Sequence, residues 1–301
     1  MKKSVSLIFT FNIVDVFAEA KFGGNQLAVF KNTHFLNTDE MQQIAKEMNY
    51  SETTFIWSDE RRDEGYDVRI FTPKTELPFA GHPTLGTAYV IQKEFIKNQV
   101  REIKLNLKIG QIPVTLDFKN NQVDTLWMKQ KSPIFGNQYG ADIMAEISGL
   151  DIDDIEESYP ICEVSTGFFC FIVPVKTLAA VEKASVNLKK FYKFIETTQA
   201  KTILVFTKET LQEKNDLHVR FFAHYLGVPE DPATGSGNGC LAAYLVKYKY
   251  FGTRKIDVRV EQGYELGRPS ILLLKAEEKA GEISVSVGGK VFMVASGKLF
   301  L

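Results

Sequence analysis

The chain has 301 residues, of which 45% are hydrophobic, and its 36 basic and 37 acidic residues give a formal net charge of -1. This length is typical of two domains that each bury a core, and the hydrophobic fraction excludes a disordered chain. The balanced charge provides no electrostatic drive toward nucleic acid or an anionic membrane, so neither is expected as a partner.

The three cysteines, Cys162, Cys170 and Cys240, lack the spacing of a metal site, and an odd, sparse count indicates a reducing compartment. The apolar run from Val5 to Phe11 is too short for a secretory signal. No stretch approaches the roughly 20 apolar residues of a membrane span. The sequence therefore predicts a cytoplasmic protein without a metal.

The first predicted elements are strands at 11–17 and 27–30, joined by a glycine turn. An amphipathic helix follows, because Met41, Ile44, Ala45 and Met48 recur at helical spacing; Asn37 or Thr38 caps it and it ends near Asn49. A strand at 51–57 then carries one acid, Glu52, among β-branched and aromatic residues.

A strand at 68–72 leads into the first glycine-rich turn, Pro78-Phe79-Ala80-Gly81-His82-Pro83-Thr84-Leu85-Gly86, which opens an apolar helix. Strands are expected next at about 102–107, 112–118 and 124–129. The segment Lys129 to Gly140, with Pro133 and Gly136, is interpreted as a connector.

The second half repeats this order. A helix around 188–195 and strands at 202–207 and 217–223 precede a second turn, Glu230-Asp231-Pro232-Ala233-Thr234-Gly235-Ser236-Gly237, and another apolar helix. The strands before the two turns have nearly the same sequence, Val68-Arg69-Ile70-Phe71 and Val219-Arg220-Phe221-Phe222. The chain therefore contains an internal duplication.

Four further strands are expected near 255–261, 270–275, 282–287 and 291–295. The predicted fold class is α+β, with two pseudo-symmetric domains that each pack one apolar helix against a mostly antiparallel sheet. The domains are residues 1–128 and 129–288, with the strand at about 289–301 expected to pack back onto the first. A small-molecule site is expected in the cleft between them.

Both turns have the chemistry of an anion site. Glycine lets backbone N–H groups converge, and a helix N-terminus presents unpaired donors with partial positive charge. The donors near Gly81, Gly235 and Ser236 are therefore candidates for binding a small carboxylate.

Glu52 is the candidate acid/base, because a partly desolvated carboxylate has a raised pKa and can carry a proton near neutral pH. A solvated or ion-paired structural glutamate is an equally good interpretation. Ser51, its neighbour, is a candidate substrate-binding residue.

His82 and Asp231 are the other catalytic candidates. A positive helix end favours a neutral imidazole at His82, which could then hydrogen-bond to substrate, although a capping role is as plausible. Asp231 fits an ordinary Asp-Pro turn, but the duplication places its turn in the same role as the turn that carries His82. His218 and His224 are interpreted as structural.

These motifs together resemble the PhzF-like (phenazine biosynthesis) family. The resemblance is carried by Gly24-Asn25-Gln26-Leu27-Ala28-Val29, Asn49-Tyr50-Ser51-Glu52-Thr53, the two glycine turns, and Gln262-Gly263 to Gly267-Arg268-Pro269-Ser270. It implies the diaminopimelate epimerase-like fold, with each sheet wrapped around a central helix, and an isomerase without metal or organic cofactor. It also implies that Glu52 moves a proton between carbons while His82, Asp231 and Ser236 bind or activate a carboxylate substrate, and it suggests a homodimer.

Some positions depart from the family pattern. Gln26 stands where proline is usual, Asn238 where histidine is frequent, and Leu266 where methionine is common. The thiol-dependent epimerases of this fold carry a cysteine in each turn, whereas this chain has Ala80 and Thr234 at about those places. The resemblance therefore implies chemistry without a thiol pair.

Two alternatives stay open. A racemase or epimerase would use Glu52 and Asp231 as two bases on one carbon, and a catalytically silent protein would use the turns only to bind a carboxylate. Glu52 argues against the silent protein, since a carboxylate does not help to bind an anion.

Overall fold

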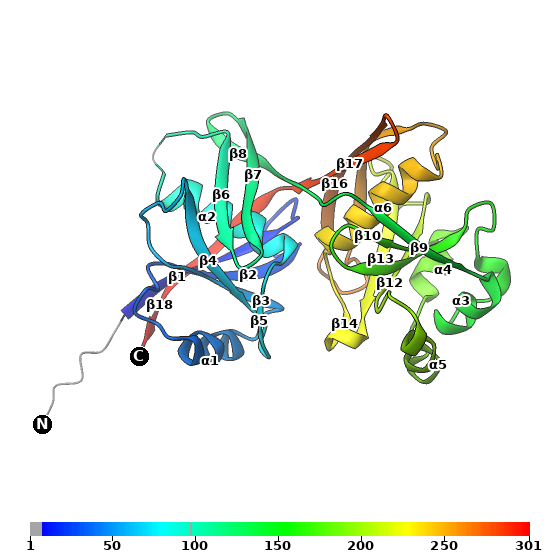
Figure 1. The fold of residues 1–301 in the computed structure, drawn as a ribbon, viewed down its shortest axis with the longest axis horizontal. Helices are drawn as coiled ribbons and strands as arrows, with labels where there is room; N and C mark the ends of the chain where they lie inside the picture. The colour runs from blue at the N-terminus through cyan, green and yellow to red at the C-terminus, as the bar shows by residue number, and fades with distance from the viewer. Residues whose placement is uncertain (1–7, 97) are drawn as a thin grey trace, which may run out of the picture. The chain divides into compact units, whose positions relative to one another are not determined.

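The computed structural model describes residues 8–96 and 98–301. The chain divides into two compact units, unit 1 with the chain up to Met128 together with Gly289–Leu301, and unit 2 with Lys129–Gly288. Each unit packs strands against one long, largely buried helix, α2 in unit 1 and α6 in unit 2 (Figure 1).

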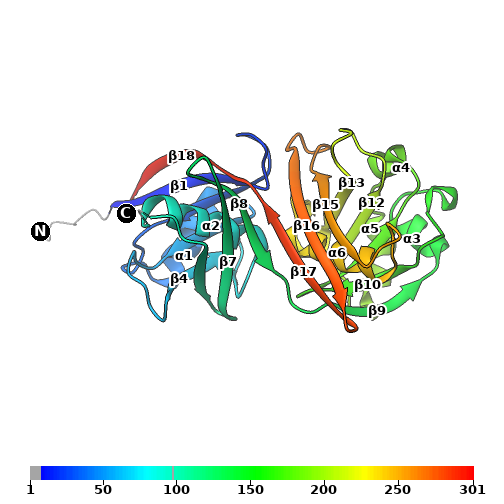
Figure 2. The same ribbon diagram turned by 90° about the horizontal axis from the view of Figure 1, so that it is seen from above.

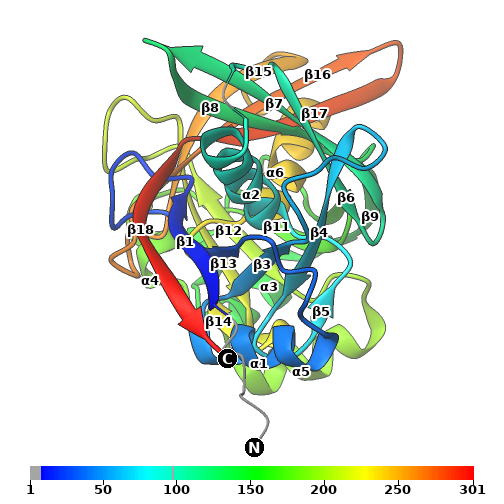
Figure 3. The ribbon, with the colours of Figure 1, turned by 90° about the vertical axis from the view of Figure 1, so that its left-hand side faces the viewer.

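Unit 1 contains two long helices and a sheet whose last strand comes from the C-terminal end of the chain. Its elements are β1 (Ile8–Val16), β2 (Asn25–Phe30), α1 (Thr38–Met48), β3 (Glu52–Ile56), β4 (Gly65–Phe71), β5 (Glu76–Leu77), α2 (Gly81–Glu94), β6 (Glu102–Leu107), β7 (Gly110–Lys119), β8 (Gln122–Lys129) and β18 (Val291–Phe300). β18 runs antiparallel beside β1, from Ile8 opposite Phe300 to Val16 opposite Val291 (Figures 2 and 3).

Unit 2 has the same sheet with more short helices around it. Its elements are β9 (Ile134–Tyr139), α3 (Ala141–Ile147), η1 (Ile152–Asp154), β10 (Ile161–Ser165), β11 (Phe169–Pro174), α4 (Leu178–Lys183), α5 (Leu188–Phe194), η2 (Ile195–Thr197), β12 (Ile203–Thr207), β13 (Leu217–Ala223), η3 (His224–Leu226), β14 (Val228–Glu230), α6 (Gly235–Lys247), β15 (Lys255–Gln262), β16 (Ser270–Lys279) and β17 (Glu282–Gly289).

The strand pairing of the two units is the same. β2–β3 and β4–β6 are parallel in unit 1, as are β11–β12 and β13–β15 in unit 2, and the remaining matched pairs are antiparallel. The registers also agree, because Phe71 pairs with Thr53 and its repeat counterpart Phe222 pairs with Ile203. The duplication predicted from the sequence is therefore a duplication of structure, and it matches positions on the paired strands of one unit to positions on those of the other.

The central helices are apolar because the sheet covers most of their surface. In α2 only Gly81, Tyr89, Lys93 and Glu94 are not buried. Gly86 allows this close approach, since a Cβ there would lie 2.6 Å from Leu27 Cδ2 and 2.9 Å from Val16 Cγ2. Packing at this distance fixes where α2 begins relative to β1 and β2.

Most predicted elements are confirmed with boundaries shifted by one to five residues, and Asn37 caps α1 with a reciprocal bond from Glu40. The interpretation of Lys129 to Gly140 as a connector is wrong, because β9 lies within it and pairs with β10. Pro133 and Gly136 suggest a loop locally, but β10 offers partners that the local sequence cannot reveal. The strands β5, β10 and β14 and the short helices α3 and α4 were also not predicted.

Candidate functional site

Glu52 and His82 meet in unit 1. Glu52 is the first residue of β3, and His82 lies in the first turn of α2. Glu52 Oε2 lies 3.5 Å from His82 Nε2, and their side chains are 17% and 7% exposed. The two candidates therefore form one buried acid–imidazole pair at the N-terminus of α2.

Burial decides the electrostatics of Glu52. Desolvation disfavours its charged form and, against a hydrogen bond with the Ser51 side chain, raises the pKa of Glu52 to about 7. Ser51 Oγ in turn lies 3.1 Å from Asn25 Oδ1 at the start of β2. A carboxyl with this pKa is present in both protonation states at neutral pH, as a group that takes and returns a proton requires.

The raised pKa of Glu52 predicts a pH-dependent stability. The Glu52 carboxyl ionises less readily in the folded state than in the unfolded state. Its contribution to the free energy of unfolding is therefore complete below pH 4.5 and is lost as the pH rises to about 7 and above. The full effect is about 3 kcal/mol. Glu52→Gln should therefore be more stable than the parent above pH 7 and should lose this advantage below pH 4.5, as measured by urea unfolding. The exposed Glu47→Gln is the control, and equal gains in both variants would contradict the buried-acid assignment.

The helices behind the two glycine turns lack side-chain caps. Among the other α-helices, α1, α4 and α5 are capped by Asn37, Thr177 and Asn187, whose side chains accept a backbone bond, and α3 has no side-chain cap but has Asp142 in its first turn. Neither Ala80 before α2 nor Thr234 before α6 makes such a bond, and neither helix has an acidic residue in its first turn. Gly81, Gly235 and Ser236 therefore begin helices whose positive ends keep their capacity for an external anion.

In unit 2 a buried glutamine holds the second turn. Gln262 Oε1 accepts from Thr234 N at 3.3 Å and from Asn238 Nδ2 at 2.8 Å, while its Nε2 donates to Asp231 O at 2.7 Å. The Thr234 hydroxyl donates to Asp231 Oδ2 at 2.6 Å and accepts from Gln262 Nε2 at 3.2 Å, so it is engaged with these partners and does not cap α6. The side chain of Asp231 is thus oriented by its own turn.

The next residue, Gly263, allows β15 to reach the turn. Its φ is +78°, and a Cβ would lie 2.5 Å from Pro232 O. No other residue type fits this position without displacing the backbone that carries Asp231.

The structure thus gathers the predicted residues into two groups, one in each unit. Glu52, His82, Ser51 and Gly81 lie together in unit 1, and Asp231, Gly235 and Ser236 lie together in unit 2. The sequence interpretation missed the role of Gln262, although its dipeptide with Gly263 stood in the family pattern. It also missed Asn238 as a partner of that glutamine, noting it only as a departure from the family.

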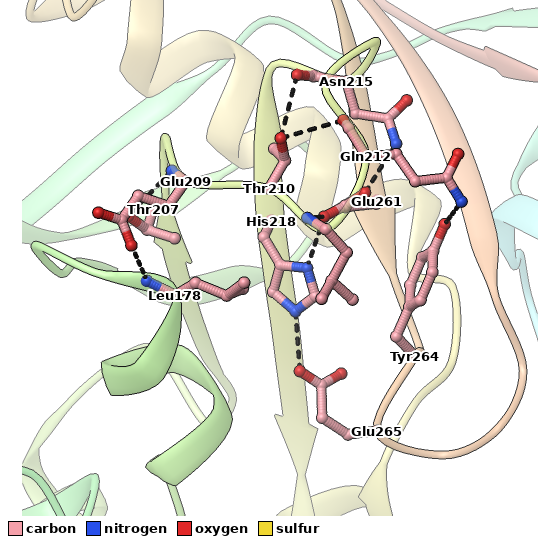
Figure 4. Close-up of polar contacts among 11 residues, drawn as sticks. Leu178, Thr207, Glu209, Thr210, Gln212, Asn215, His218, Glu261, Tyr264 and Glu265 are labelled. Carbon is pink, nitrogen blue, oxygen red and sulfur yellow. Dashed lines mark hydrogen bonds and ion pairs between the residues drawn. The ribbon is translucent and has the colours of Figure 1, made fainter.

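His218 has partners on both sides of its ring, as Figure 4 shows. Its Nδ1 lies 3.0 Å from Glu261 Oε1 and its Nε2 lies 2.8 Å from Glu265 Oε1, and its side chain is fully buried. Two carboxylate partners require a proton on each ring nitrogen. Burial opposes this charge, but the two carboxylates outweigh it and raise the pKa of His218 to about 9.

Within residues 8–96 and 98–301, no cluster of three or more His, Cys, Asp or Glu side chains has the arrangement of a metal site. Over the same residues, no helix combines the length and hydropathy needed to span a membrane. The three cysteines are buried and unbridged.

Comparison with known proteins identifies the family. The model of the family described as phenazine biosynthesis-like protein, PhzC-PhzF, matches residues 14–297. An uncharacterised isomerase of Pasteurella multocida is 33% identical, over 97% of this chain and 94% of its own length. Trans-2,3-dihydro-3-hydroxyanthranilate isomerase of Pseudomonas chlororaphis is 32% identical, over 96% of this chain and 98% of its own.

The fold comparison agrees. The crystal structure of a Bacillus anthracis phenazine biosynthesis protein of the PhzF family has a TM-score of 0.88 at 26% identity, and the match covers 98% of this chain and all of that one. The diaminopimelate epimerase-like fold implied by the resemblance is therefore confirmed. The chain belongs to the phenazine biosynthesis-like (PhzC-PhzF) family of isomerases.

Proposed function

We propose that the chain moves a proton between two carbons of a small carboxylate-bearing metabolite, with Glu52 as the acid/base. The observation that carries this proposal is the position of a buried carboxyl, with a pKa of about 7, beside His82 at an uncapped helix N-terminus. A relative acts, by its name, on trans-2,3-dihydro-3-hydroxyanthranilate. We therefore propose substrates of that kind, a ring or chain with a carboxylate beside an acidic C–H bond.

In the proposed reaction, ionised Glu52 takes a proton from one carbon, and the electron pair of that C–H bond delocalises into the substrate. The protonated carboxyl then returns the proton to a second carbon, where a new C–H bond forms. No net proton is consumed, and Glu52 ends ionised, as it began. His82 and the positive end of α2 stabilise the negative charge that develops between the two steps.

The second turn holds the substrate carboxylate in this proposal. Gly235 and Ser236 supply backbone donors at the start of α6, and Asp231, oriented by Thr234, accepts a hydrogen bond from an amino or hydroxyl group of the substrate. The homodimer and the cytoplasmic location expected from the sequence stay predictions.

A two-base racemase is the second candidate, with Asp231 as the partner of Glu52. The duplication provides an observation against a symmetric pair of bases. The strand registers match Glu52 to Thr202 in unit 2, so the position equivalent to the acid carries a hydroxyl. Asp231 is also engaged by the Thr234 hydroxyl. Both facts support a single proton carrier.

Isotope exchange tests the proposal. We expect the protein, incubated in deuterated water with a panel of small carboxylates that begins with trans-2,3-dihydro-3-hydroxyanthranilate, to convert one of them. A single carrier that partly exchanges with solvent should give product with less than one deuterium per turnover at the new C–H position. A racemase would instead invert one centre and retain the skeleton. Binding of a panel member without exchange or conversion would favour the silent carboxylate-binding protein.

A further inference from the structure

The duplication has preserved one ion pair in each unit. In unit 1, Arg69 Nε and Nη2 donate to the two carboxylate oxygens of Glu76 at 2.8 and 2.9 Å. In unit 2, Arg220 Nε and Nη2 donate to the two oxygens of Glu230 at 2.9 and 2.7 Å. We name these the first and second clamp.

Each clamp has the same position in the chain relative to the glycine turn that follows it. Each arginine occupies the second position of the repeated strand sequence, in β4 or β13, and each glutamate lies on the short strand that leads into the turn, in β5 or β14. Glu76 precedes the N-cap residue Ala80 by four positions, and Glu230 precedes Thr234 by the same four. The clamps therefore fix the strand ends from which both helix N-termini follow.

The arginine of each clamp also packs on an aromatic ring and donates further hydrogen bonds, unlike an isolated ion pair on the surface. Arg69 packs over Phe71 at 5.1 Å and donates to Thr38 Oγ1 at the start of α1. Arg220 packs over Phe222 at 4.8 Å and donates to the carbonyl oxygens of Val181, Glu182 and Ala184 at the end of α4. Planar, bidentate arginine pairs of this kind set geometry as well as supplying attraction.

The two clamps differ in burial. The side chains of Arg69 and Glu76 are 29% and 21% exposed, whereas those of Arg220 and Glu230 are 12% and 10% exposed. The second clamp also has Glu265, on the loop 263–269, near enough to Arg220 for the cation to help lower the pKa of that carboxyl. In unit 1 the turn between β6 and β7 is short, and the first clamp instead lines an open hollow of about 530 Å³.

We infer that Arg69–Glu76 and Arg220–Glu230 are positioning residues, which hold the backbone donors of α2 and α6 in the geometry that an anionic ligand needs. They do not touch the ligand in this inference; they act through the six-residue segments Glu76–Gly81 and Glu230–Gly235. The binding part rests on the proposed function, and the geometric part does not.

The chain offers a matched control for the first clamp. Arg62 and Asp67 form another bidentate pair, at 2.7 and 2.8 Å, and Asp67 lies on the same strand β4. Both pairs line the same hollow, but Asp67 connects β4 to the loop before it, through Arg62, and to β6, through Asn106 Nδ2 at 2.9 Å, and not to the turn. Asp67→Asn therefore removes a bidentate ion pair, one whose arginine is 67% exposed, without loosening the approach to α2.

The test compares Glu76→Gln, Glu230→Gln and Asp67→Asn by amide hydrogen exchange. We expect exchange in residues 78–86 to become at least tenfold faster in Glu76→Gln and to stay near the parent rate in Asp67→Asn. Glu230→Gln should affect residues 231–239 alone. Exchange over 78–86 that is equally fast in Glu76→Gln and Asp67→Asn would overturn the inference, and so would parental exchange in both.

Sulfate binding gives the functional readout. The Kd for sulfate, measured calorimetrically at a temperature where all variants are folded, should rise threefold to tenfold in the clamp variants and stay unchanged in Asp67→Asn. The charge-reversed double variant Arg69→Glu with Glu76→Arg should recover part of both readouts, because the pair is restored, but not all, because Lys108 Nζ lies 3.9 Å from Glu76 Oε2 and would then face a cation. An unchanged Kd in Glu76→Gln with faster exchange would overturn the binding role.

A parent protein that does not bind sulfate would count against the proposed anion capture, and the exchange experiment would still decide the geometric role of the clamps. If Glu230→Gln does not fold, because its pair is the more buried one, the first clamp carries the test by itself.

Discussion

Glu52→Gln should reduce turnover by roughly 10²–10⁴, the usual contribution of general acid–base catalysis. The amide keeps the size of the side chain and a hydrogen-bonding group beside His82, but it cannot take or return a proton. A ligand that binds through the turns should still bind, so the Kd of a competitive carboxylate should change little while kcat falls. Steady-state kinetics on the substrate found by isotope exchange, with a parallel binding measurement, checks both parts.

The pH profile of the parent sharpens this test. Burial raises the pKa of Glu52 to about 7. Since the ionised carboxylate is the base, kcat/KM should rise with pH and level off near pH 7, not near pH 4.5. Glu52→Asp keeps a titratable carboxyl on a side chain that is one methylene shorter. This variant should retain more activity than Glu52→Gln. Turnover of the Gln variant at the parental rate would leave Glu52 with a structural role only and would refute the mechanism.

His218→Gln should cost roughly 3–5 kcal/mol of stability at pH 6, since it removes the buried cation that pairs with the fully buried Glu261 carboxylate and with Glu265, whose side chain is 17% exposed. Glu261 also accepts from Asn215 Nδ2 at 2.7 Å and from the backbone N–H of Leu211, so the loss should loosen loop 208–216 as well. Urea unfolding of the parent and the variant measures the difference. The exposed His34→Gln is the matched control.

The pH dependence of this loss of stability follows from the pKa values of His218, Glu261 and Glu265. The pKa of His218 is raised to about 9, so its contribution is complete below about 6.5 and is lost as the pH rises through 9. The pKa values of Glu261 and Glu265 are lowered, mainly by His218 against the effect of burial, so their contribution is lost in acid. The difference in free energy of unfolding between the parent and His218→Gln should therefore become smaller above pH 6.5. A difference that stays constant up to pH 10 would contradict a charged His218.

Local sequence predicted the elements whose patterns are complete within a few residues. β6 and β13 were placed to the residue, because alternating or continuous apolar residues bounded by polar turns define a strand without outside help. The strands β5, β9 and β14 were not predicted, since neighbouring strands supply the hydrogen bonds that define them. β10 was also missed, although its five residues are all buried. The wrongly assigned connector at 129–140 is the clearest case.

The candidate site shows the same division. The glycine turns at the helix starts could be predicted from the sequence. Glu52 could also be identified there, because it is an acid on an otherwise apolar strand. That Glu52 meets His82 at 3.5 Å depends on how α2 lies against β3, which no local pattern encodes. Gln262 is a further example, because a glutamine at the end of a strand has no signature of burial. The arginines of the two clamps did carry a signal, as both stand in the repeated strand sequence.

A ribosome makes β1 first and β18 last, although the two strands lie side by side. At typical rates of about 5–20 residues per second, the N-terminal strand waits roughly 15–60 s for its partner. The strands that form the sheet of unit 2 emerge in that interval, so the C-terminal unit can finish folding before the N-terminal one, the reverse of the usual order of domains on a nascent chain. Until residues 291–300 emerge, the outer edge of β1 is an open template for strand addition. A chain cut short near Gly289 should therefore leave this edge of β1 open and aggregate.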